Sequence, residues 1–227
     1  MGLFIATALT AIWGISLVTL LAVELNPLLR PLALMWMTFL YTGLFITAHD
    51  AMHGTVSPGH HRVNLWVGRI VLLLYALFSF EALRREHFKH HRYPSSGRDP
   101  DYHDGVHRGP VAWYLRFMRH YLTPLQVTGM AVLFNLLYHL ASVPVHRLIL
   151  FWAGPALLST VQLFTFGTYL THREPRTGYI EPHRTRSLAL NTAASFLACY
   201  HFGYHWEHHA FPGQPWWRLP RVRRENG

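Results

Sequence analysis

Residues 31–53 read PLALMWMTFLYTGLFITAHDAMH and join an apolar run to two histidines, His49 and His53. The apolar part, residues 31–48, approaches the ~20 residues that an α-helix needs to cross the hydrocarbon core of a bilayer. Because residues four positions apart share one face of a helix, both imidazoles project toward one point. This stretch predicts a membrane helix that brings two nitrogen ligands to the membrane surface.

Two further histidine clusters have related spacing: HFKHH at residues 87–91 and HWEHH at residues 205–209. We expect each triplet to share one helix face and to present two or three imidazoles to a single point. Neutral imidazole suits iron, copper, nickel and zinc, whereas hard cations prefer oxygen ligands. One tetrahedral site needs only about four ligands, so the clusters predict two metal ions. The clustered candidate ligands are His49, His53, His87, His90, His91, His205, His208 and His209.

Four other residues are candidates for the same site. His172 follows the last expected membrane crossing, and His201 lies one helical turn before His205 if the helix is continuous. Asp50 either orients a ligating imidazole or hydrogen-bonds a helix end. Glu207 either accepts a hydrogen bond from a ligating histidine or is part of the solvated surface.

The composition, 51% hydrophobic and 14% charged, is too apolar for an ordinary soluble fold. We expect one all-α integral membrane domain over residues 1–227, with four transmembrane helices and two hydrophobic segments that do not cross. The expected crossings are residues 3–23, 31–48, 121–143 and 148–171. The non-crossing segments are residues 65–80 and 187–202, because the clusters can meet only on one side of the membrane.

The distribution of charge indicates the orientation. Of the 20 lysines and arginines, only Arg30 and Arg147 fall in the two short loops on the far side. The positive-inside rule therefore predicts that the histidine clusters and both termini are cytoplasmic. Basic residues at the edges of apolar segments explain the net charge of +9, so we expect no nucleic-acid partner. A single cysteine, Cys199, excludes an intrachain disulfide and an iron–sulfur site.

The sequence segments around the three clusters resemble those of a known family. They are FITAHDAMHGTV at residues 45–56, HFKHHRYP at 87–94 followed by DPDYH at 99–103, and FGYHWEHHAFPGQPWWRLP at 202–220. With these words the chain resembles the β-carotene ketolases of the membrane fatty acid desaturase and hydroxylase superfamily. The resemblance implies a cytoplasmic histidine-box di-iron site. It implies iron ligation by the eight clustered histidines and by His172, with His201 as a further candidate.

The implied activity is that of a non-haem di-iron oxygenase with O2 as co-substrate and no catalytic residue beyond the metal site. Two hydroxylations at C4 of the β-ionone ring, followed by loss of water, would convert β-carotene to echinenone and then to canthaxanthin. The implied partners are a carotenoid, a ferredoxin-like electron donor and the lipid bilayer. A carotenoid hydroxylase or an acyl-lipid desaturase is the alternative on the same scaffold. A haem electron carrier or a metal transporter is disfavoured, because the clusters lie at helix ends rather than near the middle of the membrane.

Overall fold

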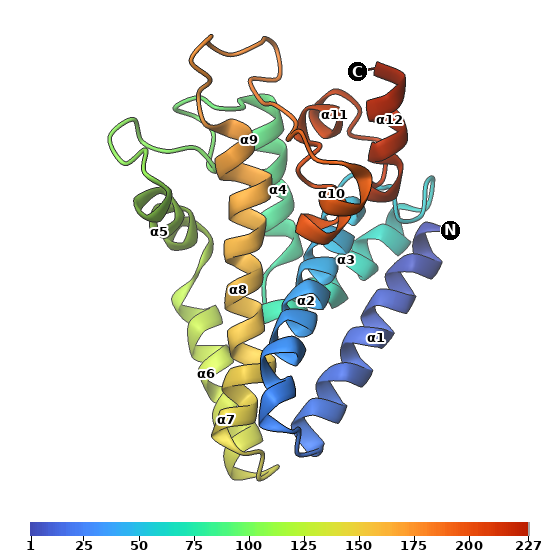
Figure 1. Cartoon of the computed structure of the whole chain (residues 1–227), viewed down its shortest axis with the longest axis vertical. Coiled ribbons are helices and arrows are strands. Elements are labelled where there is room, and N and C mark those ends of the chain that lie inside the picture. Colours follow the sequence, from blue (N-terminus) through green and yellow to red (C-terminus); the bar gives the residue numbers. More distant parts are fainter. Residues whose placement is uncertain (227) are drawn as a thin grey trace.

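The structure, a computed structural model, describes residues 1–226, and these residues form helices and loops without a strand (Figure 1). In chain order the helical elements are α1 (Gly2–Ala22), η1 (Pro27–Leu29), α2 (Arg30–Met52), α3 (His61–Ala76), α4 (Phe80–Arg92), α5 (Pro110–Tyr121), α6 (Pro124–His139), α7 (Val145–Leu148), η2 (Ile149–Ala153), α8 (Gly154–Leu163), η3 (Phe164–Tyr169), α9 (Leu170–His172), α10 (Thr192–Cys199), α11 (His205–Ala210), η4 (Trp216–Arg218) and α12 (Leu219–Asn226).

Three helical segments are long and apolar enough to cross a membrane. They are α1, the segment Pro27–Met52 that ends with α2, and the segment Val145–His172 that contains α7, α8 and α9. α2 packs against α1, α3 and α8, and its Tyr41 and Leu44 are fully buried. On α1, in contrast, Phe4 is 77% exposed. Apolar side chains can face lipid without cost, so close packing between helices decides which face of α2 is buried.

α3 and α4 form a helix pair that is bent by 102°. Leu77 ends α3 in the left-handed conformation with φ 58°, and the Ser79 hydroxyl caps α4 by accepting a hydrogen bond from a backbone amide of its first turn. Gly68 gives room to the Phe80 ring, since a Cβ there would lie 2.1 Å from a ring carbon. The bend brings the HFKHH cluster back to the end of α2, so the two clusters lie at the same end of the bundle.

Two other hydrophobic segments form shorter helices than their apolarity suggests. The expected crossing at residues 121–143 contains α6, whose 16 residues rise only about 24 Å, against ~30 Å of hydrocarbon. α5 ends at Tyr121 and α6 begins at Pro124, and the chain turns at Ser142, where φ is 54°. Three segments therefore have membrane length where the sequence predicts four crossings. At residues 187–202 the helix α10 has eight residues and rises about 12 Å, too little to cross.

Ion pairs join the two loops at the end of the bundle that lies away from the histidine clusters. Glu24 pairs with Arg30 at 2.7 Å and also with Arg147, which donates a further hydrogen bond to the Leu21 carbonyl at 3.1 Å. In Figure 1 these loops, between α1 and α2 and between α6 and α7, lie at the lower end. α9, α11 and the end of α4 lie at the upper end, so the histidines that they carry are on one side of the molecule (Figure 1).

Candidate metal centre

Five imidazoles from three helices converge at the upper end of the bundle. His49 and His53 come from the end of α2, His87 and His91 from α4, and His208 from α11. We call these residues the five-histidine group, and their candidate ligand nitrogens all lie within 4.8 Å of one another. The Nε2 atoms of His53 and His87 are 2.7 Å apart, and those of His49 and His208 are 3.1 Å apart. The arrangement fits a site in which several imidazoles face one ion.

A second group lies beside the first. The four-histidine group consists of His90, His172, His205 and His209, all of which are buried, and it meets the same 4.8 Å criterion. The Nε2 atoms of His90 and His209 are 3.1 Å apart. The ring of His91, from the five-histidine group, stacks on that of His209 with 4.2 Å between ring centroids. The two groups are therefore neighbours, and together they contain nine of the candidate histidines.

The helix spacing divides each triplet between the two groups. Positions i+3 and i+4 are about 100° apart around a helix axis, so two adjacent histidines point in different directions. In α4, His87 and His91 belong to the five-histidine group, whereas His90 belongs to the four-histidine group. α11 is divided in the opposite way, with only His208 in the five-histidine group. Each triplet therefore presents two imidazoles to one group and the third to the other, because the same spacing supplies two adjacent points.

Hydrogen bonds to the second ring nitrogen orient two of these imidazoles. Nδ1 of His90 is 2.9 Å from a carboxylate oxygen of Asp99, and the Ser95 hydroxyl is 3.0 Å from Nδ1 of His172. Such partners commonly fix the tautomer and orientation of metal-ligating histidines. The Nε2 atoms of His172 and His205 are buried and have no hydrogen-bond partner within the described residues. Because buried polar atoms are nearly always paired, these nitrogens indicate a ligand from outside the chain.

The environment keeps the imidazoles of α11 neutral. Burial, reinforced by the nearby imidazole of His90, lowers the pKa of His205 to about 3. Burial and neighbouring imidazoles also lower the pKa values of His208 and His209 well below their ordinary value. A neutral imidazole keeps a free lone pair, so these side chains are in the protonation state that binds a transition metal.

The two carboxylates named from the sequence contact groups other than the imidazoles. Asp50 accepts a hydrogen bond from the backbone amide of Trp216 at 3.3 Å, while its distance to Nδ1 of His49 is 3.8 Å. Glu207 is only 5% exposed, so the solvated alternative was wrong, and it pairs with Arg223 at 3.0 Å. Asp50 therefore joins the C-terminal segment to the end of α2, and Glu207 joins α12 to α11.

His201 lies outside both groups. α10 ends at Cys199, and the backbone of Tyr200 and His201 has positive φ angles of 46° and 62°. The chain thus turns sharply before α11 begins at His205, and the helical turn that the spacing suggested between the two histidines does not exist. Instead, the His201 ring stacks on Tyr204 with a centroid distance of 5.6 Å and an interplanar angle of 10°.

Asp99 contacts the site through a hydrogen bond to His90 that the sequence did not predict. It lies in the loop between α4 and α5, is 7% exposed, and accepts hydrogen bonds from the backbone amides of Ser95 at 2.7 Å and Asp101 at 2.9 Å as well as from His90. The carboxylate of Asp99 is visible in the sequence DPDYH, but the spacing of residues does not show which group it contacts. An irregular loop has no period from which the direction of a side chain could be read.

An apolar pocket reaches the five-histidine group from within the bundle. His49 and His87 are part of its wall, and so are Asp101 and Tyr121, which are hydrogen-bonded to each other. The other lining residues are mostly apolar or aromatic: Phe45, Met52, Tyr75, Phe78, Leu83, Phe117, Met118, Thr160 and Leu163. A pocket with apolar walls and few polar groups suits a hydrophobic small molecule whose orientation is set at a few points.

Comparison with known proteins gives a consistent result. The family model described as "Fatty acid desaturase" matches residues 25–134 and 123–227. A "Beta-carotene ketolase" of Paracoccus sp. (strain PC1) is 42% identical over 216 residues, which cover 92% of this chain and 85% of the relative. A "Beta-carotene ketolase" of Haematococcus lacustris is 42% identical over 83% of this chain and 60% of its own length. A "Zeaxanthin 4-ketolase" of Chlamydomonas reinhardtii is 42% identical over 82% of this chain and 42% of its own length.

Proposed function

The chain belongs to the fatty acid desaturase family, and from this premise we propose that it is a β-carotene 4-ketolase. In this oxidoreductase, O2 oxidises C4 of the β-ionone ring to a ketone, so that β-carotene yields echinenone and then canthaxanthin. The observation that carries the proposal is the apolar pocket of about 70 Å³ with His49 and His87 in its wall, which would seat an apolar ring beside a metal once the side chains of its wall move apart. The names of the relatives support a carotenoid as the substrate.

The proposed cofactor is a pair of iron ions, one in each histidine group. An all-imidazole donor set suits iron, and the buried Nε2 atoms of His172 and His205 without partners support metal binding. When bound, the irons supply the activation of O2. Imidazoles in groups of five and four argue against haem, whose axial ligation needs only one or two. We assign no ligand role to His201, and we assign Asp50 and Glu207 a role in holding the C-terminal segment.

The chain's own contribution is to place the ring and to exclude water. The walls of the pocket, for example Met52 and Leu163, would contact the ring, and His49 and His87 set where the metal lies relative to it. The Asp101 carboxylate accepts a hydrogen bond from the Tyr121 hydroxyl in the same wall. It has further lone pairs, so it would accept a hydrogen bond from a hydroxyl group newly formed at C4.

The stoichiometry requires a partner. Two hydroxylations of the same carbon give a gem-diol, which loses water to leave the ketone. Each hydroxylation consumes one O2, two electrons and two protons and releases one water. Because the two electrons must come from outside the chain, we propose a ferredoxin-like donor, which a basic protein surface would attract.

The proposed topology is a single membrane domain with four crossings, of which α6 is the third, and with the histidine groups and both termini in the cytoplasm. Three helical segments of membrane length support this topology. The charge distribution also supports it, because only Arg30 and Arg147 among the 20 lysines and arginines fall in the two short loops on the far side. α6 would reach across with the help of its flanking residues and local thinning of the bilayer.

Pigment analysis of a β-carotene-producing cell that expresses the chain tests the proposal. We expect echinenone and canthaxanthin, and purified protein with about two irons per chain and no Soret band. An alcohol at the ring would instead indicate a hydroxylase, and a new double bond in a fatty acid would indicate a desaturase. Unchanged β-carotene in cells that contain the protein and sufficient iron would refute the ketolase assignment.

A variant pair on α8 tests the pocket. Leu163→Trp places a large ring in the pocket wall, so we expect at least a tenfold loss of ketone formation with unchanged iron content. Leu158→Trp is the matched control, because Leu158 lies on the same helix and is 44% exposed. Equal ketone formation by both variants would argue that the substrate ring does not occupy this pocket.

A further inference from the structure

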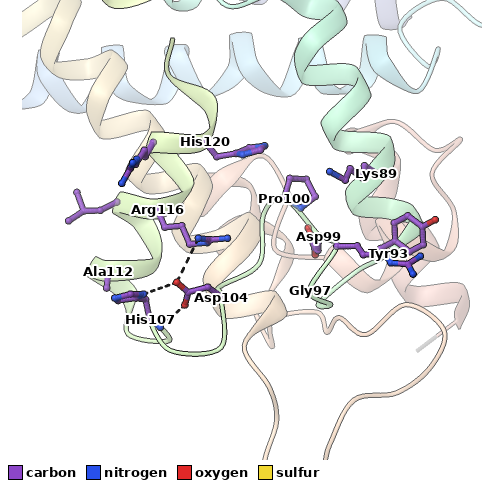
Figure 2. A pocket seen from close by; sticks show the side chains of 13 residues that line it. Lys89, Tyr93, Gly97, Asp99, Pro100, Asp104, His107, Ala112, Arg116 and His120 are labelled. Atoms are coloured by element: carbon purple, nitrogen blue, oxygen red, sulfur yellow. Dashed lines mark hydrogen bonds and ion pairs between the residues drawn. The ribbon is translucent and has the colours of Figure 1, made fainter. Parts of the chain in front are cut away.

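A second, larger cavity of about 920 Å³ opens between the end of α4, the loop of residues 93–109 and α5 (Figure 2). Four side chains that are always charged and positive line it: Lys89 on α4, Arg98 in the loop, and Arg116 and Arg119 on α5. All four residues are exposed. The cavity thus differs in chemistry from the apolar pocket, and nothing in the proposed placement of the ring uses it.

The carboxylates of this cavity are already engaged by other groups. Asp104 accepts hydrogen bonds from the backbone and the ring of His107 at 2.8 and 2.7 Å, and it lies 3.7 Å from Arg116 (Figure 2). Arg98 and Arg119 form no ion pair with a carboxylate within residues 1–226. The rim of the cavity therefore carries an excess of positive charge that the chain itself does not neutralise.

The wall of the cavity is in direct contact with the candidate metal centre. Asp99 lines the cavity, and its carboxylate is hydrogen-bonded at 2.9 Å to Nδ1 of His90, a member of the four-histidine group. A molecule seated in the cavity is thus separated from a metal ligand by one carboxylate. The apolar pocket instead lies against His49 and His87 of the five-histidine group.

We propose that this cationic cavity is the docking surface for an acidic one-electron carrier protein, with Asp99 and His90 as the link to the metal centre. The proposal rests on the proposed function, since each hydroxylation takes up two electrons. Two reduced carrier molecules would each release one electron and leave oxidised, while water supplies the two protons. Complementary charge would steer the carrier to the cavity and make its binding sensitive to salt.

The composition of the cavity favours a protein over the head group of an anionic lipid. A single phosphate that entered the cavity would meet the carboxylates of Asp99 and Asp104 as well as the cations. An acidic protein surface can instead spread over several exposed cations of the rim at once, including Arg98 and Arg119, which pair with no carboxylate within residues 1–226. An anionic lipid is the competing occupant, and the experiment separates the two.

Binding is measured with metal-free, full-length protein in nanodiscs, and the probe is an oxidised plant-type [2Fe–2S] ferredoxin. The double variant Arg116→Glu/Arg119→Glu should bind at least tenfold more weakly than the wild type at about 50 mM NaCl, and the difference should shrink at about 300 mM. The matched control Arg62→Glu/Arg176→Glu changes the net charge equally at exposed positions outside the cavity, and it should bind within twofold of the wild type. The milder single variant Arg119→Gln, with an intermediate loss expected, covers the case in which the double variant misfolds.

Turnover of the iron-loaded enzyme gives a second readout. The double variant should raise the KM for ferredoxin at least tenfold, while ketone formation driven by dithionite stays at the wild-type rate. Wild-type binding by Arg116→Glu/Arg119→Glu, or equal weakening in the control, would overturn the proposal. A different result would indicate a lipid site and would also overturn the proposal. In that case phosphatidylglycerol would raise the melting temperature of the wild type but not of the double variant, and both proteins would bind ferredoxin equally. The ketolase function alone would be refuted if the wild type formed no ketone with ferredoxin or with dithionite but still bound ferredoxin at the cavity.

Discussion

The substitution Asp99→Asn removes the charge from the hydrogen-bond partner of one imidazole in the proposed metal centre. Asp99 is buried in the loop between α4 and α5 and contacts the four-histidine group only through His90. Asparagine has nearly the same shape but no charge and only one acceptor oxygen. The change therefore alters the partner of Nδ1 of His90 while it leaves the volume of the side chain almost unchanged.

The size of the effect follows from the number of donors. The Asp99 carboxylate accepts hydrogen bonds from Nδ1 of His90 and from the backbone amides of Ser95 and Asp101. The two oxygens share these three donors, so at least one N–H group would face the amide nitrogen of asparagine and lose its acceptor. A hydrogen bond to a charged group contributes about 1.5–3 kcal/mol. That range agrees with the roughly 10–100-fold loss of metal affinity expected when such a partner is changed.

Chelator competition on the purified enzyme measures this loss. We expect one iron of Asp99→Asn to bind about 10–100-fold more weakly and the other to remain near the wild-type affinity, because the five-histidine group has no contact with Asp99. Asp104→Asn is the matched control, since Asp104 bonds to loop groups and not to a histidine of either group. Unchanged affinity in Asp99→Asn, or the same loss in both variants, would refute the assignment of Asp99 as the residue that positions His90.

Three further outcomes are expected. His201→Ala should keep both irons by metal analysis, whereas His205→Ala should lose one; loss of an iron from the first variant would contradict the placement of His201. Gly167→Ala should lower the melting temperature by several degrees, because the new Cβ would lie 2.3 Å from the Phe202 ring, whereas Gly14→Ala, with nothing within 4 Å, should match the wild type. Burial lowers the pKa of His205 to about 3 from 6.5, so between these pH values the unfolded chain binds more protons than the folded chain. The metal-free protein should therefore lose stability as the pH falls through this range. A melting temperature that rises on acidification would contradict this.

Much of the fold follows from local patterns in the sequence. The apolar run that ends at His49 and His53 forms α2, and the bent pair of α3 and α4 returns the second cluster to the same side. The sequence was less informative at residues 121–143, where α6 is only 16 residues long. Hydropathy continues through that segment, but Pro124 and the turn at Ser142 limit the helix. The ends of a helix depend on backbone conformation, which composition describes poorly.

The sequence predicted which histidines lie in the site better than it predicted how they are divided between the two groups. Nine of the ten candidate histidines lie in the two groups, and His172 joins them from a different helix. His201 is the exception, because the positive φ angles of Tyr200 and His201 end the helix before His205 is reached. The contact between Asp99 and His90 also depends on a loop, so the spacing of residues could not reveal it.

The sequence predicts apolar segments long enough for a membrane and histidines at helical spacing that can act as nitrogen ligands. These properties follow from composition and from the fixed period of the α-helix, which are local. How the histidines are shared between the two groups depends on the packing of α2, α4 and α11, because neighbours such as His90 and His91 point in directions about 100° apart. The tertiary structure also placed Asp99 between a cationic cavity and His90, a contact that only the folded loop creates.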